Sequence, residues 1–377
     1  MNLQRFLWIA LFGFALQSVI YFGLFHPLFN QNLALFISFL LYISSLIYAV
    51  FIHTPHPLTQ KLSLSLGIIF VLFCSSLLSL LILGICKVFF PPALEYQKLW
   101  TSCLLILACC GIIYSIFKAL IPLKLYTQTL HIPKLQTPLK ILQLSDIHIG
   151  VNYLSDSKLL DIITQSNALN PDIIALTGDI IDTQSQSVLE KIQMLSKLKA
   201  KYGVFYVLGN HEYFYDVNNI LDELSKIGIK TLVNENFVLE IDSKPILNIA
   251  GIADLSARAY QKLLPNLENI PLPNLEKTIQ SLNPNLPSIL LSHQPKVIDL
   301  LPSPSPFSLI LSGHTHGGQV FPFNFLVKLE QPFVKGLYTL KDTYLYVNQG
   351  TAFCGIPMRL GSECEITLIE LVGESKA

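Results

Sequence analysis

The stretch Ser308-Leu309-Ile310-Leu311-Ser312-Gly313-His314-Thr315-His316 decides the fold: a short apolar run stops at a glycine, and two histidines follow. Apolar runs of about four to six residues bounded by glycine or proline are typical of buried β-strands. Two imidazoles two residues apart at the end of a strand serve little structural purpose. We therefore interpret this stretch as a buried strand that delivers two histidines to a metal or catalytic site.

Four more stretches follow the same plan, each a short apolar run that ends in a small residue and a metal-type ligand. The runs and their endings are 139–145 before Asp146-Ile147-His148, 172–177 before Gly178-Asp179, 204–208 before Gly209-Asn210-His211-Glu212, and 288–292 before His293. Helical patterns lie between some of these runs, at 155–167, 187–199 and 217–227. Alternating strands and helices predict an α/β layered domain, which gathers polar side chains beyond the carboxyl ends of its strands.

The gathered set holds two carboxylates, one amide and four imidazoles: Asp146, His148, Asp179, Asn210, His293, His314 and His316. Because no thiolate is among them, a structural zinc site of the cysteine type is excluded. The mixed nitrogen and oxygen donors suit Mn, Fe, Co, Ni or Zn better than Ca or Mg alone. Two ions need about eight coordination bonds, so one bridging carboxylate would make these side chains sufficient.

Two metal ions about 3.5–4 Å apart suit hydrolysis of a phosphate ester, because they neutralise developing charge and lower the pKa of a bound water. His211, left over beside Asn210, is then a candidate for donating a proton to the leaving oxygen. Taken singly, Asp-x-His is typical of a turn, and Gly-Asp is common in loops. All these endings together, each after a strand, make a purely structural interpretation improbable.

The first 120 residues differ in composition from the rest. Hydrophobic residues make up 51% of the chain and charged residues 13%, well below the roughly 25% of a soluble protein. Six charged residues fall in 1–120, and four runs without charge occur there, at 6–24, 33–52, 64–86 and 99–117. Each is close to the roughly 20 residues that cross a bilayer as a helix. One such run is compatible with a buried core helix, but four in series predict a membrane region.

Lysine and arginine residues near the runs predict the orientation. With the N-terminus inside, the outer side holds only Lys87 and Lys98. The inner-side residues are Arg5, Lys61, Lys118, Lys124 and Lys134. An even number of spans then places the rest of the chain in the cytoplasm, attached to the inner (cell) membrane. In that compartment Cys354 and Cys364 are expected to stay reduced.

The charge balance argues against specific nucleic-acid binding. The net charge is zero, and the arginines are only Arg5, Arg258 and Arg359, so no arginine-rich reading face exists. Arg258 and Arg359 lie outside the apolar third, and either is a candidate for binding a phosphate group. An ordinary ion pair on the surface or in the core is the alternative for both.

Together these motifs closely resemble those of the calcineurin-like metallophosphoesterase superfamily. The resemblance covers about 139–371, and the forms at 209–213 and 313–319 look like its membrane-associated bacterial phosphodiesterase branch, which includes UDP-diacylglucosamine pyrophosphate hydrolase-type enzymes. It implies an α/β domain of two mixed sheets flanked by helices, here after a four-helix transmembrane region. The expected parts are a membrane domain (1–120), a linker (121–138) and a metallophosphoesterase domain (139–377).

The resemblance also implies a role for each site residue. Metal 1 would be held by Asp146, His148, Asp179 and His316, and metal 2 by Asp179, Asn210, His293 and His314. His211 would be the catalytic imidazole, and Asp182 and Glu212 would orient the ligands from behind. The implied cofactors are two divalent ions: Mn, Fe or Zn.

The expected function is hydrolysis of a phosphodiester or pyrophosphate bond at the membrane, with a lipid-linked substrate favoured because four spans exceed what tethering needs. Two alternatives stay open: a membrane-tethered hydrolase of soluble nucleotides or phosphodiesters, and a binding or sensor protein. Apolar residues on both sides of the histidine motifs either form a lipid-contacting patch or pack inside the domain. They are Leu263, Leu264, Leu267, Ile270, Leu272 and Leu275, then Phe321, Phe323, Phe325 and Leu326.

Overall fold

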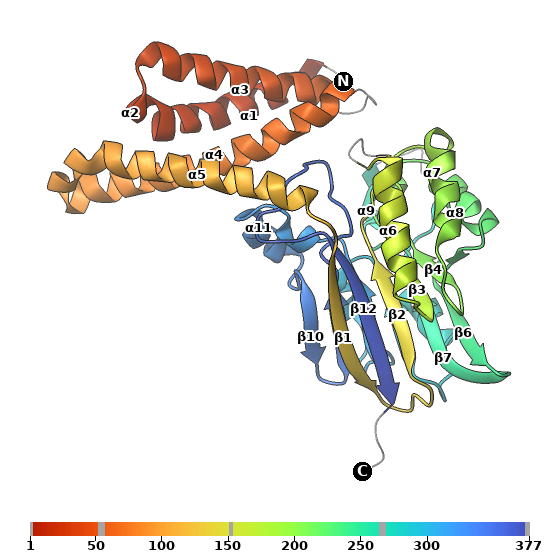
Figure 1. The fold of residues 1–377 in the computed structure, drawn as a ribbon. Coiled ribbons are helices and arrows are strands. Elements are labelled where there is room, and N and C mark those ends of the chain that lie inside the picture. Colours follow the sequence, from red (N-terminus) through yellow and green to blue (C-terminus); the bar gives the residue numbers. More distant parts are fainter. Residues whose placement is uncertain (1–2, 52–56, 151–153, 264–268, 374–377) are drawn as a thin grey trace. The chain divides into compact units, whose positions relative to one another are not determined.

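The computed structural model forms two compact units, each built from more than one segment of the chain (Figure 1). The first comprises Met1–Ile121 with two short later segments, Val320–Pro322 and Gly355–Leu360. The second comprises the remainder, so the chain leaves the second unit twice and returns to it. The residues that the structure describes are 3–51, 57–150, 154–263 and 269–373.

Long apolar helices with short connections build the first unit. The helices are α1 (Leu3–Ile20), α3 (Gln31–Phe51), α4 (Pro57–Phe89) and α5 (Gln97–Leu120), and the connections are η1 (Tyr21–Phe25), α2 (His26–Leu28) and η2 (Pro91–Tyr96). Four stretches are long and apolar enough to cross a membrane: Leu7–Leu28, Gln31–Val50, Leu62–Phe89 and Pro91–Leu120. The four apolar runs are thus confirmed as helices, although residue 52, the predicted end of the second, lies outside the described residues.

The two later segments of this unit pack among its helices. Val320 and Met358 are buried in the same apolar cluster as Ile112 of α5. The backbone N–H of Arg359 donates to the carbonyl of Ser115, also on α5, at 3.0 Å. Residues far apart in the sequence therefore share one core in the first unit.

Two six-stranded sheets form the centre of the second unit. Their strand orders are β1-β12-β2-β3-β4-β5 and β10-β11-β9-β8-β7-β6, and both are mixed. Strands β2 to β5 run parallel in the first sheet, as do β7, β8, β9 and β11 in the second. The strands are β1 (Lys124–Ile132), β2 (Leu139–Leu144), β3 (Ile173–Thr177), β4 (Val204–Val207), β5 (Lys230–Thr231), β6 (Glu235–Ile241), β7 (Lys244–Gly251), β8 (Ser288–Leu291), β9 (Leu309–Ser312), β10 (Gly336–Leu340), β11 (Thr343–Val347) and β12 (Glu365–Gly373).

An apolar layer holds the two sheets face to face. Ile141 of β2 and Ile173 of β3 share it with Ile289 of β8 and Leu309 of β9, and all four side chains are fully buried. Burying such a side chain stabilises the fold by about 1.5–3 kcal/mol relative to leaving it exposed. This layer therefore fixes the two sheets against each other and sets the positions of their carboxyl ends.

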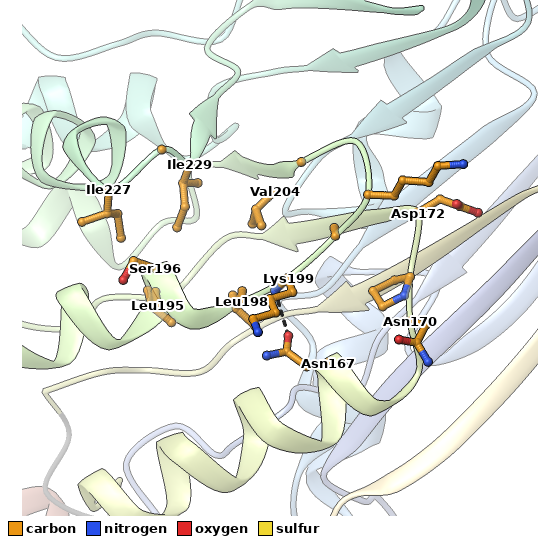
Figure 2. Close-up of a pocket in the computed structure, with 15 residues that line it drawn as sticks. Asn167, Asn170, Asp172, Leu195, Ser196, Leu198, Lys199, Val204, Ile227 and Ile229 are labelled. Atoms are coloured by element: carbon orange, nitrogen blue, oxygen red, sulfur yellow. Dashed lines mark hydrogen bonds between the residues drawn. The ribbon is translucent and has the colours of Figure 1, made fainter. Parts of the chain in front are cut away.

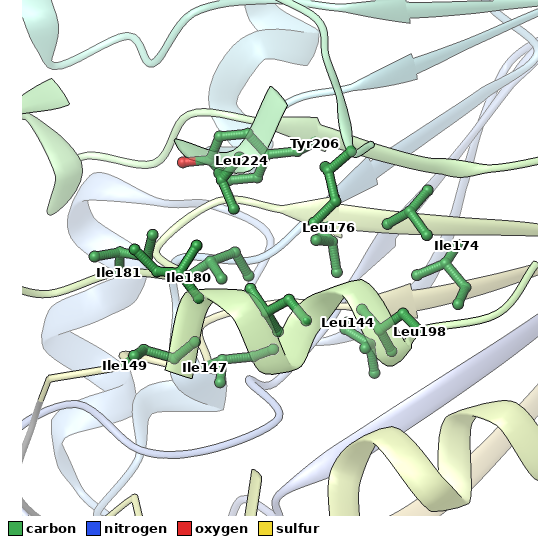
Figure 3. Packing of buried hydrophobic residues seen from close by; sticks show 14 of the residues in the cluster. Leu144, Ile147, Ile149, Ile174, Leu176, Ile180, Ile181, Leu198, Tyr206 and Leu224 are labelled. Carbon is green, nitrogen blue, oxygen red and sulfur yellow. The ribbon is translucent and has the colours of Figure 1, made fainter. Parts of the chain in front are cut away.

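Helices cover the outer face of the first sheet. Because successive residues of a strand point to opposite faces, Ile174 and Leu176 point away from the second sheet and pack with Leu159 of α6 and Ile220 of α8. Figure 3 shows Ile174 and Leu176 in this cluster. The helices of this unit are α6 (Asp156–Ala168), α7 (Leu189–Met194), α8 (Val217–Lys226), α9 (Ala257–Leu263), α10 (Leu275–Gln280) and α11 (Phe323–Glu330), with short turns η3 (Ser185–Val188), η4 (Leu195–Lys197), η5 (Glu212–Phe214), η6 (Pro295–Leu300) and η7 (His316–Gly318).

A smaller cluster covers the outer face of the second sheet. Leu290 of β8 and Ile310 of β9 are buried there, with Leu275 and Ile279 of α10 packed against them. The predicted fold class, an apolar helical region followed by two mixed sheets flanked by helices, is therefore confirmed. Helices α6 and α8 lie within a residue or so of the predicted bounds, and the side chain of Ser155 caps α6 by accepting from the N–H of Lys158.

The segment 121–138, predicted as a linker, contains a strand. Strand β1 pairs in parallel with β12 over its whole length, from Lys124 opposite Glu365 to Ile132 opposite Gly373. The partner strand lies near the other end of the chain, and β1 mixes polar with apolar residues, as an edge strand does. Local periodicity therefore gave no signal for it.

Two further segments differ from the prediction. The helix expected at 187–199 is broken into the turn η3, the short helix α7 and the turn η4. The hairpin of β6 and β7 was not predicted; it turns at Asp242 and Ser243, both with positive φ, and carries a bulge between Leu239 and Glu240. The bulge interrupts the alternation of side chains by which a strand is recognised.

Candidate metal centre

The structure brings all seven predicted ligands to one place. They follow β2, β3 and β4 of the first sheet and β8 and β9 of the second, at carboxyl ends that parallel pairing brings to one edge of each sheet. Six of them form two groups, and within each group the ligand atoms lie within 4.8 Å of one another. The groups are Asp146, His148 and His316, and Asp179, His293 and His314. The seventh residue, Asn210, lies beside the second group, with its Oδ1 3.1 Å from Nε2 of His293.

Five of the seven candidate ligands have left-handed backbone conformations. Their φ angles are positive: Asp146 (55°), His148 (52°), Asp179 (50°), His314 (70°) and His316 (49°). Such angles are uncommon outside glycine and cost free energy, so they persist only where the surroundings impose them, as at functional sites. The strand endings therefore turn sharply enough to aim these side chains inward.

Gly313 lets two strand endings approach closely. A Cβ at this position would collide with the hydroxyl of Ser145 and the carboxylate of Asp146. The Ser145 hydroxyl itself donates to Asp146 Oδ2 at 2.5 Å, and the N–H of His314 donates to the same oxygen at 3.1 Å. The glycine of the histidine motif thus allows the ends of β2 and β9 to share one carboxylate.

The spacing of the imidazole nitrogens fits metal ions. Nε2 of His148 lies 3.2 Å from Nε2 of His316, and Nδ1 of His314 lies 3.2 Å from Nε2 of His293. Two nitrogen ligands at about 2.0–2.1 Å from one tetrahedral ion are about 3.3 Å apart. Each pair also has a buried carboxylate at hand, with Asp146 Oδ1 3.2 Å from His316 Nε2 and Asp179 Oδ2 3.1 Å from His293 Nε2. The donor set therefore suits two divalent cations.

The carboxylates of the site are held in their charged form. Burial alone would raise the pKa of Asp146, but the neighbouring His316 and His293 outweigh it and lower that pKa below its usual range. The pKa of Asp179 is lowered for the same reason, chiefly by His293 and His211. Buried negative charge that needs positive partners is the electrostatic condition for binding cations.

The histidines respond to the same field in opposite directions. Burial would lower the pKa of His293, but Asp179 outweighs it and raises that pKa to about 10. Burial and the neighbouring His293 together lower the pKa of His314 to about 3. The pKa values of these two neighbouring imidazoles are thus shifted in opposite directions.

Asp182 orients two imidazoles at once. Its Oδ1 accepts from Nδ1 of His211 at 2.9 Å, and its Oδ2 accepts from Nδ1 of His148 at 3.2 Å. The other ring nitrogen of His211, Nε2, then faces Asp179 Oδ2 at 3.9 Å. Burial opposes protonation of His211, but Asp179 and Asp182 outweigh it and raise its pKa well above the usual value. His211 therefore presents a proton towards the candidate metal ligands.

Glu212 holds the loop that carries Asp179. It is fully buried, and its carboxylate accepts from the backbone N–H groups of Asp179 (3.2 Å), Ile180 (2.7 Å), Ile181 (3.1 Å) and Gly209 (2.9 Å). Burial, together with the charge of Asp179, raises the pKa of Glu212 to about 7. Both residues predicted to stand behind the ligands thus contact the ligands or their backbone.

The two arginine candidates each make a contact within their own unit. The guanidinium of Arg258 donates to the carbonyl of Pro273 at 2.9 Å. Arg359 belongs to the first unit, where its backbone contacts Ser115. A phosphate-binding role for either residue stays a prediction.

Sequence reasoning missed Cys354, which the structure places in a third group with His148, Asp182 and His211. Its Sγ lies 3.9 Å from Nε2 of His211. A signal was present, because the segment containing Cys354 follows the carboxyl end of β11, which runs parallel to β9. The rule that located the other ligands therefore also applies to this strand.

A hollow of about 700 Å³ lies at the opposite ends of β3 and β4 (Figure 2). Asp172 and Gly203, which precede these strands, line it, and so does Lys199, whose N–H donates to Asn167 Oδ1 at 2.8 Å. None of the candidate ligands lines this hollow. Ligands of open α/β sheets bind beyond the carboxyl ends of the strands, so the hollow is separate from the candidate metal centre.

Comparisons with known proteins agree with the fold. The calcineurin-like phosphoesterase family matches residues 139–318. An uncharacterized metallophosphoesterase of Campylobacter jejuni is 41% identical over 273 residues, covering 72% of this chain and 69% of that protein. One from Helicobacter pylori is 34% identical, covering 67% and 65%.

A mammalian relative also carries the word transmembrane in its name. This Bos taurus protein, named as a transmembrane protein with a metallophosphoesterase domain, is 36% identical over 248 residues, covering 64% of this chain and 54% of that protein. The matches thus span about half to two thirds of these relatives' lengths. The chain belongs to the calcineurin-like metallophosphoesterases, a family of hydrolases that use divalent metals, and it joins such a domain to four apolar helices.

Proposed function

We propose that this protein is a membrane-bound phosphoesterase with two divalent metal ions that hydrolyses a phosphodiester or pyrophosphate bond. One observation carries the proposal: seven nitrogen and oxygen ligands from the ends of five strands converge on two groups, next to an imidazole held by a carboxylate. A binding or sensor role would not require His211 to be oriented in this way.

The residues divide between two ions in the proposal. Metal 1 would be held by Asp146, His148, Asp179 and His316, and metal 2 by Asp179, Asn210, His293 and His314, so Asp179 would serve both ions. The donor set suits Mn, Fe or Zn. Such ions supply positive charge to phosphate oxygens and lower the pKa of water in the site.

In the proposal, side chains of the protein supply the proton that the leaving group needs. Asp182 holds His211 Nδ1, so His211 Nε2 is the atom that faces the candidate ligands. In the proposal this nitrogen donates its proton to the leaving oxygen, which general acid catalysis requires to be within hydrogen-bonding reach. Asp182 then stabilises the orientation of the ring throughout, because its second oxygen is fixed by His148.

The test uses bis(p-nitrophenyl) phosphate and the full-length protein in detergent. Hydrolysis is expected to require a divalent transition metal and to be lost in Asp179→Asn, because that residue serves both ions. His211→Ala is expected to retain metal while turnover falls by about 10²–10⁴-fold, the usual contribution of a general acid. A folded His211→Ala protein with near-normal turnover would exclude the catalytic role of this imidazole.

A lipid-linked substrate is the finer part of the proposal, and helix α11 supports it. On α11 the exposed fractions of Phe323, Phe325 and Leu326 are 45%, 57% and 56%, and no residue of this helix is buried. Phe321, which belongs to the first unit, is 52% exposed. Such exposed aromatic and aliphatic side chains, directly after the histidine motif in the chain, suit contact with acyl chains.

For the other half of the possible patch, the alternative of packing inside the domain mostly holds. Ile270 and Leu272 pack against the core cluster under α6 and α8, and Leu275 packs against the cluster on the second sheet. Only Leu263 is strongly exposed among the described residues of that half. Leu264 and Leu267 lie outside the described residues.

A pair of substrates separates the two hydrolase alternatives. A lipid-linked pyrophosphate is expected to be cleaved with much higher kcat/KM than its deacylated analogue. Phe323→Asp and Phe325→Asp are expected to lower kcat/KM for the lipid-linked substrate only, with Leu160→Asp, an exposed residue of α6, as the control. Equal efficiency on both substrates would favour a membrane-tethered hydrolase of soluble phosphodiesters or nucleotides.

We also propose the location of the parts. The distribution of lysine and arginine favours the inner (cell) membrane with the phosphoesterase domain in the cytoplasm. The division of the chain into a membrane domain (1–120), a linker (121–138) and a phosphoesterase domain (139–377) stays a prediction. The expected partners are the lipid bilayer and a phosphate-containing substrate.

A further inference from the structure

Cys354 stands beside the imidazole that the proposed reaction uses. Its Sγ lies 3.9 Å from His211 Nε2, and the same nitrogen lies 3.9 Å from Asp179 Oδ2. The ligand atoms of Cys354, His211, Asp182 and His148 all lie within 4.8 Å of one another. Sulfur, nitrogen and oxygen donors therefore surround one small region next to the two ligand groups described above.

The position of Cys354 is fixed by the histidine motif itself. The side chain of Gln319 binds its backbone twice: the Cys354 N–H donates to Gln319 Oε1 at 3.3 Å, and Gln319 Nε2 donates to the Cys354 carbonyl at 3.0 Å. Gln319 has a positive φ of 45°, and the hydroxyl of Ser362 donates to its carbonyl at 3.0 Å. A strained residue three positions after His316 thus holds the thiol in place.

The segment before Cys354 is attached to the other side of the site. The N–H of Thr351 donates to the carbonyl of Ser145 at 2.7 Å, and the N–H of Ala352 donates to the carbonyl of Asp146 at 3.3 Å. Cys354 is therefore anchored to the endings of both β2 and β9. The other cysteine of this unit, Cys364, is buried and its Sγ contacts the carbonyl of Ala352 at 3.8 Å.

We propose that Cys354 Sγ and His211 Nε2 form a third metal position, which binds thiophilic divalent cations such as Zn²⁺ or Cd²⁺ and inhibits the enzyme. On one tetrahedral ion, a sulfur ligand at about 2.3 Å and a nitrogen ligand at about 2.0–2.1 Å are about 3.6 Å apart. The observed 3.9 Å needs only a small adjustment. Two bonds form, from the metal to sulfur and to nitrogen, and the thiol proton and the Nε2 proton of His211 both pass to solvent.

The chemistry of the donors makes this position selective. Thiolate sulfur prefers soft or borderline cations, whereas Mn²⁺ and Mg²⁺ prefer oxygen. A cation held by His211 Nε2 takes the nitrogen that the proposed function assigns to proton transfer. The same element can therefore activate the enzyme in the main positions and inhibit it in this one. This inference uses the proposed role of His211, but the binding of the cation does not depend on turnover.

The first measurement is inhibition of the full-length protein saturated with Mn²⁺, titrated with Zn²⁺ or Cd²⁺ while bis(p-nitrophenyl) phosphate is hydrolysed. Cys354→Ser and Cys354→Ala are each expected to raise the half-inhibitory concentration at least about tenfold, relative to their own uninhibited rate. The control Cys364→Ser is expected to leave it unchanged. Equal sensitivity of the wild type and both Cys354 variants would overturn the proposal, because the cation would then act by displacing Mn²⁺.

The second measurement needs no activity. Adding Cd²⁺ to the Mn²⁺-saturated protein is expected to produce a sulfur-to-cadmium charge-transfer absorption in the ultraviolet. This absorption should persist in Cys364→Ser, disappear in Cys354→Ser and need more Cd²⁺ in His211→Ala. The membrane helices contain five further cysteines, so the difference between wild type and Cys354→Ser is the quantity measured. The same absorption in wild type and Cys354→Ser would refute the site even if the enzyme has no activity on the test substrate.

Discussion

Replacing Asp182 with alanine tests whether one carboxylate orients two imidazoles. Asp182 accepts from Nδ1 of His211 at 2.9 Å and from Nδ1 of His148 at 3.2 Å. A hydrogen bond to a charged group contributes about 1.5–3 kcal/mol, which corresponds to about a 10- to 150-fold change in an equilibrium or rate constant. Asp182→Ala should therefore weaken metal binding through His148 and slow turnover through His211, each by about 10- to 150-fold.

Two assays separate these effects. Calorimetric titration of Mn²⁺ into metal-stripped full-length protein measures the affinity, and kcat at saturating Mn²⁺ measures the role of His211. Asp182→Asn keeps one acceptor oxygen, so it should show mainly one of the two defects, either weaker metal binding or slower turnover. Asp172→Ala is the control, because this carboxylate binds the Lys140 N–H at the opposite ends of the strands. An Asp182→Ala protein within about twofold of wild type in both assays would refute the reasoning.

Other changes test the positioning of the site and the orientation of the chain. Gly313→Ala should weaken Mn²⁺ binding, because the new Cβ meets Ser145 and Asp146 and such overpacking costs about 1–3 kcal/mol; unchanged affinity in the titration would contradict this close approach. In the wild type, the backbone N–H groups of 179–181 and 209 donate to the two carboxylate oxygens of Glu212. Glu212→Gln leaves them one acceptor oxygen, so hydrogen exchange at these residues should accelerate. Exchange at the wild-type rate would argue against this role. A reporter that works only in the cytoplasm should be active when it is fused after Ala377. Activity of a fused reporter that works only in the periplasm would overturn the predicted topology.

The candidate ligands could be named from the sequence because their signal is local. Each candidate ligand follows directly after an apolar run, and the end of a run in glycine, aspartate or histidine can be seen without knowing its neighbours. His293 is the clearest case, since it is a single histidine after β8 and no motif surrounds it. Parallel pairing gathers the strand endings within each sheet. His293 and Asp179 follow strands of different sheets, so their contact also requires the two sheets to pack face to face.

The sequence failed where the signal depends on distant partners. Strand β1 is stabilised by β12, near the other end of the chain, and its mixed polar and apolar residues resemble a linker. Cys354 was overlooked because it does not follow β11 directly; it comes seven residues after Val347, on a loop held by Gln319. The sequence also left open whether the phenylalanines of α11 are exposed, because the same residues could pack in a core or form an apolar surface.

The return of the chain to the helical unit means that the membrane region is no detachable anchor. Val320 and Met358 come from segments that flank the last strands of the hydrolase, yet their neighbours are side chains of the first 120 residues. Deleting the helices would leave these side chains without partners, so the truncated protein should aggregate rather than become a soluble enzyme. Protease treatment of vesicles should for the same reason fail to shed an active fragment. Recombination of this hydrolase with another anchor would have to replace three separate pieces of the chain together.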